Sequence, residues 1–221
     1  MKNIYVVLPR SETFIAKIGR LLTNYEYSHV TISFDDNLKE FYSFSRIYND
    51  APIISGFVKE YRSHLVNNPK ARLKCKIFKL SVSEKVYKKI KLYCKSLLLD
   101  KTLLFNYVSM LLLPLNGGIK VVKSYNCTHF VAEVLSMIPY INLKKEKYKY
   151  KPKDFELLLQ KKYFYFEGYL NIDDNRYNDD IYFNKVPLKK KFIISLYYLK
   201  ETLHRLLLKK ESNNFDNKKY M

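Results

Sequence analysis

In the middle of the chain, a segment with the hydrophobic periodicity of a β-strand is followed directly by a segment with the periodicity of an α-helix. This succession restricts the fold class more than any other feature of the sequence. Residues 73–80 (LKCKIFKL) alternate between apolar and polar side chains, which predicts a β-strand with one buried face. Residues 84–99, preceded by the capping residues Ser81 and Ser83, carry apolar side chains at helical spacing. The chain therefore combines strands and helices.

The same analysis assigns elements to most of the first 170 residues. Residues 27–34 and 39–46 predict a β-hairpin closed by the turn Asp35-Asp36-Asn37, whereas residues 47–72, with Pro52, Gly56 and Pro69, indicate an irregular segment. Further strands are expected at 4–8 and 162–170, and helices at 11–24, 103–113, 124–138 and 152–159. This order is typical of an α+β domain.

The character of the chain changes at about residue 171. Residues 171–186 are polar and predict a linker, and residues 187–209 predict a basic amphipathic helix that is followed by a disordered tail to residue 221. The helix is expected either to pack on the domain's own core or to bind an anionic membrane surface. Its apolar stripe consists of Phe192, Leu196, Leu199, Leu203, Leu206 and Leu207.

Composition limits the possible partners. The 221 residues are 48% hydrophobic, which suits a single domain of residues 1–170 with an appendage at 187–221. The net charge of +19 is compatible with a polyanionic partner, but also with lysine drift in an AT-rich coding sequence. No RNP motif, zinc finger or Gly-rich phosphate loop is present, so we expect no specific nucleic-acid binding.

The cysteines and the apolar segments indicate the compartment. The three cysteines form no CxxC pair, so we expect neither a disulfide framework nor a metal site, and no cofactor motif is visible. The apolar stretch near the N-terminus is shorter than a signal-peptide core, and no stretch approaches the length of a membrane span. We expect a cytoplasmic protein, located at the inner membrane face if the 187–209 helix binds lipid.

Cys127 is the cysteine placed best for chemistry. It lies in or just before the first turn of the helix predicted at 124–138, where converging N–H groups and the helix dipole stabilise a thiolate. Cys75 lies in the middle of a predicted strand and Cys94 in the middle of a predicted helix, which is typical of unreactive buried cysteines. Cys127 is therefore the candidate nucleophile.

A nucleophilic cysteine needs a base, and His29 is the best candidate. His29 lies on the strand face opposite Val30 and Ile32 and can point into a cleft. His129 would face roughly 200° around the helix from Cys127, His64 lies in the irregular segment, and His204 lies in the C-terminal helix. These residues alone leave open whether His29 is catalytic or structural.

Two motifs favour the catalytic alternative. Tyr27-Ser28-His29-Val30-Thr31-Ile32 and Tyr125-Asn126-Cys127-Thr128-His129-Phe130-Val131-Ala132 resemble the paired motifs of circularly permuted NlpC-type papain-like proteins. That group includes the YiiX-like hydrolases and the lecithin retinol acyltransferase-like proteins, and its His strand precedes its Cys helix. The resemblance covers roughly residues 4–170 and extends to residues 41–46 and 56–60, which are similar to segments of uncharacterised bacterial members. It implies a permuted papain-like fold, in which an antiparallel sheet packs on the nucleophile helix.

The resemblance also implies a third polar group that orients the imidazole, usually on the strand after the His strand. Glu40, Tyr42 and Ser43 are the polar choices there, and Ser43 matches the family's spacing best. The backbone N–H of Cys127 is the expected donor to an oxyanion. The hydroxyl of Tyr125 is a second candidate, although the Tyr125 ring could simply pack.

The resulting prediction is a cysteine-dependent hydrolase or acyltransferase. It would act on an amide, thioester or ester of a small molecule, peptide or lipid, through an acyl-enzyme intermediate on Cys127. Two alternatives stay open: a catalytically inactive papain-like binding module, and a peripheral membrane protein held by residues 187–209.

Overall fold

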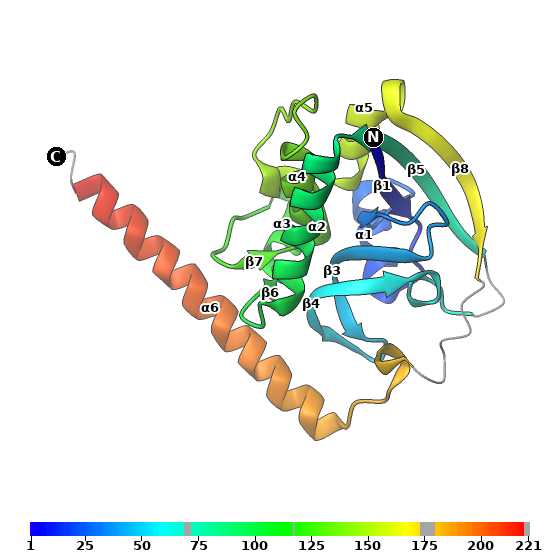
Figure 1. Cartoon of the computed structure of the whole chain (residues 1–221). Helices are drawn as coiled ribbons and strands as arrows, with labels where there is room; N and C mark the ends of the chain where they lie inside the picture. The colour runs from blue at the N-terminus through cyan, green and yellow to red at the C-terminus, as the bar shows by residue number, and fades with distance from the viewer. Residues whose placement is uncertain (69–71, 117, 173–179, 219–221) are drawn as a thin grey trace.

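The protein is described here by a computed structural model of residues 1–221, apart from residues 69–71, 117, 173–179 and 219–221. The predicted α+β class is confirmed, because an antiparallel sheet packs against helices (Figure 1). The strands of this sheet are β1 (Lys2–Pro9), β2 (Thr31–Ser33), β3 (Glu40–Tyr48), β4 (Ala51–Tyr61), β5 (Arg72–Val82) and β8 (Phe164–Asn171).

The sheet has the order β4-β3-β2-β1-β5-β8, and every neighbouring pair is antiparallel. β1 lies inside the sheet and is apolar along nearly its whole length. Its side chains alternate between two buried faces: Ile4, Val6 and Leu8 join the main core, and Tyr5 and Val7 join a smaller core on the other face. A strand buried on both faces explains the continuous apolar run of residues 4–8.

The helices are α1 (Phe14–Thr23), α2 (Glu84–Leu99), α3 (Tyr107–Asn116), α4 (Cys127–Ser136), α5 (Pro152–Tyr163) and α6 (Leu188–Lys218). Side chains of α2, α4 and α5 form the main core with one face of the sheet. α4 is the most buried of these helices: every residue from Thr128 to Leu135 except Glu133 is buried. Its position against the sheet is therefore fixed by packing along its whole length.

The prediction of an irregular segment at residues 47–72 is wrong. Residues 51–61 form β4, which pairs with β3 from Ser55 to Tyr61 and, beyond an irregularity, at Ala51, and the short 3-10 helix η1 (Arg62–Leu65) follows. β4 is the terminal strand of the sheet, so Pro52 near its start deprives no inner ladder of a donor. Only the nearest atom of Ile47, at 3.7 Å, approaches the Cβ position of Gly56, so this glycine also fits a regular strand.

Two further boundaries differ from the prediction. The strand expected at 27–34 is reduced to β2, so His29 lies in the extended segment just before it. The helix expected at 103–113 is divided into the strand β6 (Leu104–Phe105), which pairs with β7 (Ser124–Tyr125) in parallel, and the helix α3. This small pair holds the segment before Cys127 beside the start of α3.

α6 is the predicted C-terminal helix, and it extends to Lys218 rather than ending near residue 209. Its first part runs along the body beside β4, and its last part projects away from the other elements (Figure 1). Of the predicted linker 171–186, residues 173–179 lie outside the described residues, and Ile181–Phe183 form the 3-10 helix η3. No helix within the described part of the chain is long and apolar enough to cross a membrane.

Candidate active site

Cys127 is the first residue of α4, as the sequence predicts. Asn126 is the N-cap residue, and its side-chain oxygen accepts a 2.8 Å hydrogen bond from the backbone N–H of His129. The buried residues of α4 that follow Cys127 pack against the sheet. The N-terminus of this helix, and with it the sulfur of Cys127, therefore has a fixed position. The thiol of Cys127 is partly exposed, whereas Cys75 and Cys94 are buried.

The structure brings His29 to Cys127. The two side chains interact and both line the same cleft, although one precedes β2 and the other begins α4. The imidazole also contacts a carboxylate, because Nε2 of His29 lies 2.8 Å from Oε2 of Glu60. Cys127, His29 and Glu60 therefore form a continuous chain of thiol, imidazole and carboxylate, which is the order that a nucleophile, its base and an orienting acid require.

Burial and charge act in opposite directions on this chain. Burial alone would lower the pKa of His29, but the charges of Glu60 and Cys127, with their hydrogen bonds, outweigh it and raise this pKa to about 10. Burial would likewise raise the pKa of the Glu60 carboxyl, which the positive charge of His29 and hydrogen bonds from His29 and Ser45 hold below its usual range. At neutral pH the base is therefore a charged imidazolium beside the sulfur.

Ser43 does not contact His29, so its predicted role in orienting the imidazole is replaced by that of Glu60. Ser43 is fully buried on β3, and its hydroxyl donates a 3.0 Å hydrogen bond to the carbonyl of Val30. It thus holds the backbone of the residue that follows His29. Glu60 escaped prediction because it lies on β4, the strand that the sequence was expected to leave irregular.

Tyr125 packs rather than facing the cleft. Its ring stacks on Phe44 with a centroid distance of 5.3 Å and lies 4.6 Å from the ring of His129. Tyr125 is not among the residues that line the cleft around Cys127. The structure therefore does not place its hydroxyl as an oxyanion donor, and the packing alternative describes it.

The side-chain amide of Asn126 is a donor that sequence reasoning missed. Its oxygen is fixed as an acceptor, because it receives both the N–H of His129 and, at 2.9 Å, the hydroxyl of Thr128. Its NH₂ group has no hydrogen-bond partner among the described residues, and Asn126 lines the cleft next to Cys127. Together with the first N–H groups of α4, this amide supplies donors on the side of the sulfur.

The other histidines have separate surroundings. His129 points away from the cleft and lies 3.5 Å from Glu133 one turn along α4. His64 does line the cleft, but its Nε2 lies 2.8 Å from Asp180, and its ring stacks on Tyr182 at 4.0 Å. His204 is exposed on α6. Only His29 combines contact with Cys127 and a buried carboxylate partner among the described histidines.

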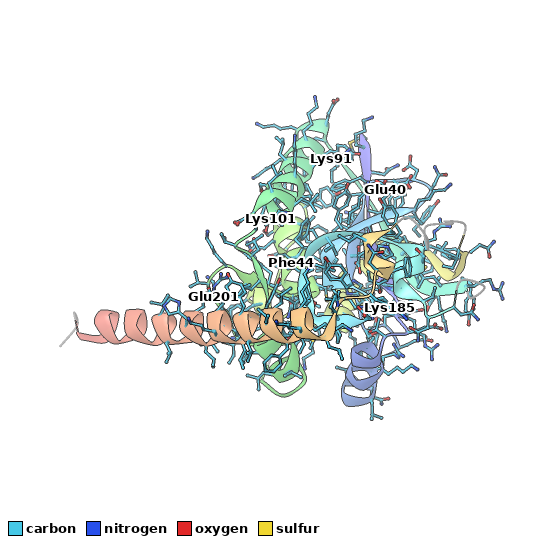
Figure 2. The ribbon with its side chains drawn as sticks, turned by 90° about the horizontal axis from the view of Figure 1, so that it is seen from below. Glu40, Phe44, Lys91, Lys101, Lys185 and Glu201 are labelled. Atoms are coloured by element: carbon cyan, nitrogen blue, oxygen red, sulfur yellow. The ribbon has the colours of Figure 1, made fainter. Side chains whose placement is uncertain are left out.

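The cleft in front of Cys127 encloses a volume of about 180 Å³. Phe44 of β3, inside the body of the molecule in Figure 2, contributes to its wall. Most of the exposed surface of its other walls is apolar, and His29, Glu60 and Asn126 are among the polar groups that line it. The apolar lining includes Ala16, Leu65, Phe105, Tyr107, Met110 and Leu113.

Within the described residues, no group of three His, Cys, Asp or Glu side chains is arranged to hold a metal ion. No protein-family model, curated protein or solved structure matches the chain with significant similarity.

Proposed function

We propose that the protein is a cysteine-dependent acyl hydrolase or acyltransferase, with Cys127 as nucleophile, His29 as base and Glu60 as the group that orients the imidazole. The contact of His29 with both Cys127 and the buried carboxylate of Glu60 carries this proposal. Burying an imidazole against a carboxylate is costly unless the charges are paired. The pairing leaves a proton on His29 at neutral pH, so a positive charge faces the sulfur of Cys127.

The proposed reaction has two halves. In the first, the thiolate of Cys127 attacks the carbonyl carbon of an ester, thioester or amide, and the carbonyl oxygen becomes an oxyanion near the Asn126 amide and the first N–H groups of α4. The imidazolium of His29 gives its proton to the leaving group as the carbon–leaving-group bond breaks. In the second, His29 takes a proton from water or another acceptor, which attacks the acyl-enzyme and restores the thiolate.

The arrangement also supports the circularly permuted papain-like fold that the two sequence motifs imply. The His precedes the Cys along the chain, the Cys begins a buried helix, and the His lies at the start of a strand in an antiparallel sheet. The alternative of an inactive binding module rested on the lack of an acid partner for His29. Glu60 supplies such a partner, so the active alternative is favoured.

The acyl group would lie in the apolar part of the cleft. Phe105, Met110 and Leu113 offer contact to a hydrophobic acyl portion, while the carbonyl reaches the polar end at Cys127. We therefore propose substrates whose acyl side is apolar. A reducing compartment, in which the sulfur stays unmodified, suits this chemistry.

The test is a burst experiment with p-nitrophenyl esters of short and medium-length fatty acids. We expect release of one equivalent of p-nitrophenol per protein, together with a mass increase equal to the acyl group on the peptide that contains Cys127. Cys127→Ala should show neither, while Cys94→Ala serves as a thiol control. Acylation that persists in Cys127→Ala, or no acylation at all with the wild type, would refute the proposal.

A further inference from the structure

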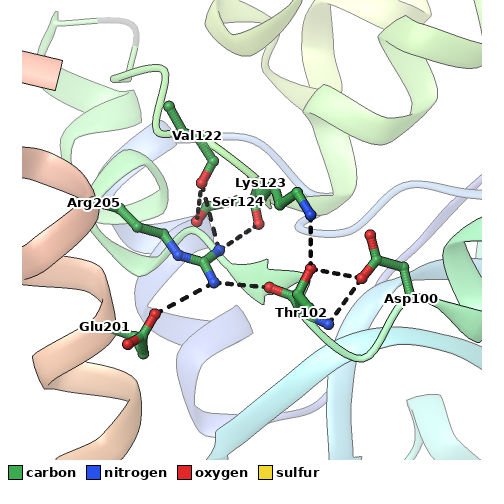
Figure 3. Close-up of polar contacts among 7 residues, drawn as sticks. All are labelled: Asp100, Thr102, Val122, Lys123, Ser124, Glu201 and Arg205. Carbon is green, nitrogen blue, oxygen red and sulfur yellow. Dashed lines mark hydrogen bonds and ion pairs between the residues drawn. The ribbon is translucent and has the colours of Figure 1, made fainter. Parts of the chain in front are cut away.

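Polar contacts to the body fix the rotation of α6. Near its start, Nζ of Lys191 lies 2.7 Å from Oδ2 of Asp50. About four turns further on, the guanidinium of Arg205 donates hydrogen bonds to the carbonyls of Thr102 (2.8 Å) and Lys123 (2.9 Å), as Figure 3 shows. These two attachments, roughly 21 Å apart along the helix, prevent α6 from turning another face toward the body.

The face held outward is the predicted apolar stripe. Except for Leu206, which is half-buried, its side chains are between 49 and 65% exposed, so the alternative that this stripe covers the domain's own core is not what the structure shows. We call this surface the α6 stripe. It consists of Phe192, Leu196, Leu199, Leu203 and Leu207.

Basic side chains accompany the α6 stripe. The segment from Leu188 to Leu208 contains four lysines and one arginine against a single glutamate. Lys189 and Lys200 follow one edge of the stripe at helical spacing, are exposed, and have no carboxylate partner among the described residues. An apolar face bordered by lysines on a helix that lies along a protein surface is the arrangement that inserts into a membrane interface.

We propose that the α6 stripe docks on an anionic lipid surface. Its leucines and Phe192 would enter the boundary between headgroups and acyl chains, and Lys189 and Lys200 would lie among the anionic headgroups. The body has the same sign, since the whole chain carries a net charge of +19. The proposal does not depend on the chemistry proposed for Cys127.

The net positive charge also disfavours a second copy of the chain as the occupant of the α6 stripe. Pairing two stripes would bring two strongly positive proteins together and place Lys189 and Lys200 near their counterparts. An anionic surface would instead attract these lysines. Added salt would weaken both the attraction of the lysines to anionic lipid and the repulsion between two copies of the chain. Lipid binding should therefore decrease with ionic strength, whereas pairing of two copies should increase.

The experiment is sedimentation of the full chain with vesicles. One vesicle contains phosphatidylcholine alone, and the other roughly three parts phosphatidylcholine to one part phosphatidylglycerol. We expect binding to the mixed vesicles that falls as salt is added. In the double variant Leu196→Glu/Leu203→Glu, the partition coefficient should fall at least about tenfold.

The matched control is Leu92→Glu/Leu157→Glu, which makes the same chemical change at two exposed leucines of α2 and α5. It should bind the mixed vesicles like the wild type, because its substitutions lie outside the stripe. Equal loss in both double variants would show a general charge effect and refute the proposal. A wild-type dimer in light scattering that Leu196→Glu/Leu203→Glu converts to a monomer would assign the stripe to a second copy instead.

Discussion

Oε2 of Glu60, on β4, lies 2.8 Å from Nε2 of His29, which precedes β2 and is 31 positions earlier in the sequence. Both side chains are nearly excluded from solvent, with exposures of 3% and 12%. Two opposite charges at this distance in a poorly hydrated site control each other's protonation. The contact therefore links the chemistry of the site to the stability of the fold, and the predictions below use that link.

The three thiols should differ in function. Cys127→Ser should abolish ester hydrolysis, while Cys75→Ser and Cys94→Ser should keep most of it, because burial raises the pKa of both other thiols to about 12. Hydrolysis of p-nitrophenyl esters and circular dichroism, measured on the same samples, check this. An equal loss of activity with all three substitutions would indicate damage to the fold.

Glu60→Gln should slow the reaction of Cys127 with iodoacetamide at pH 6–7. The substitution removes the carboxylate that keeps His29 protonated, so less positive charge faces the sulfur. One pKa unit corresponds to a factor of ten, and we expect roughly a tenfold or larger decrease in rate. The matched variant Glu40→Gln, on the neighbouring strand, should react like the wild type, and unchanged labelling of Glu60→Gln would contradict the assignment.

The same pair predicts a pH dependence of stability. Because the folded pKa of His29 is raised above its unfolded value near 6.5, its contribution is fully present below about pH 6.5 and is lost as pH rises toward 10. Between pH 7 and 9 the imidazole of His29 holds a proton in the folded state that it lacks in the unfolded state, so the His29 contribution to the free energy of unfolding should fall by up to about 1.4 kcal/mol per pH unit. Urea titrations should show a shallower decline for Glu60→Gln.

Asn126 should have separable structural and chemical roles. Asn126→Ala removes both the N-cap of α4, at a cost of about 1 kcal/mol, and the amide donor in the cleft. Asn126→Ser retains a capping oxygen but lacks the amide, so it should be more stable than Asn126→Ala yet lose kcat by on the order of 100-fold with little change in KM. Wild-type kcat for Asn126→Ser would exclude the amide from oxyanion binding.

The segment before α6 should matter more to stability than α6 itself. A chain ending at Pro187 keeps Tyr182, which stacks on His64 and donates a hydrogen bond to its carbonyl, and Val186, which packs with Ala51 and Ile54. A chain ending at Ile172 loses both, and its melting temperature should be lower by about 5–10 °C. Calorimetry that finds no difference between the two chains would contradict this packing.

The sequence predicted the elements whose periodicity is unbroken. The helix at 84–99 matches α2 at both ends, and the alternating segment 73–80 lies within β5. Prediction from the sequence failed at β4, because Pro52 and Gly56 are ordinary signals of irregular structure. A terminal strand of a sheet tolerates both residues. Strand partners follow from tertiary packing, and a single sequence does not contain them explicitly.

The residues of the candidate site likewise fall into those that a local motif predicted and one that depends on strand pairing. Cys127 and His29 were found because each lies in a local motif: a helix start in one case and an apolar strand in the other. Glu60 was missed because its role depends on the pairing of β4 with β3, where it is opposite Phe41. The strand-favouring residues Phe57, Val58 and Tyr61 were the available signal. Assigning a strand there would have placed a carboxylate in the sheet next to His29.

The order of the three groups along the chain has a consequence for biosynthesis. A ribosome produces His29 first, Glu60 next and Cys127 last, and α4 must then pack on the sheet before the sulfur meets the imidazole. A growing or prematurely terminated chain that lacks α4 holds His29 and Glu60 but not Cys127. The sulfur therefore meets the imidazole and its carboxylate only in a nearly complete domain.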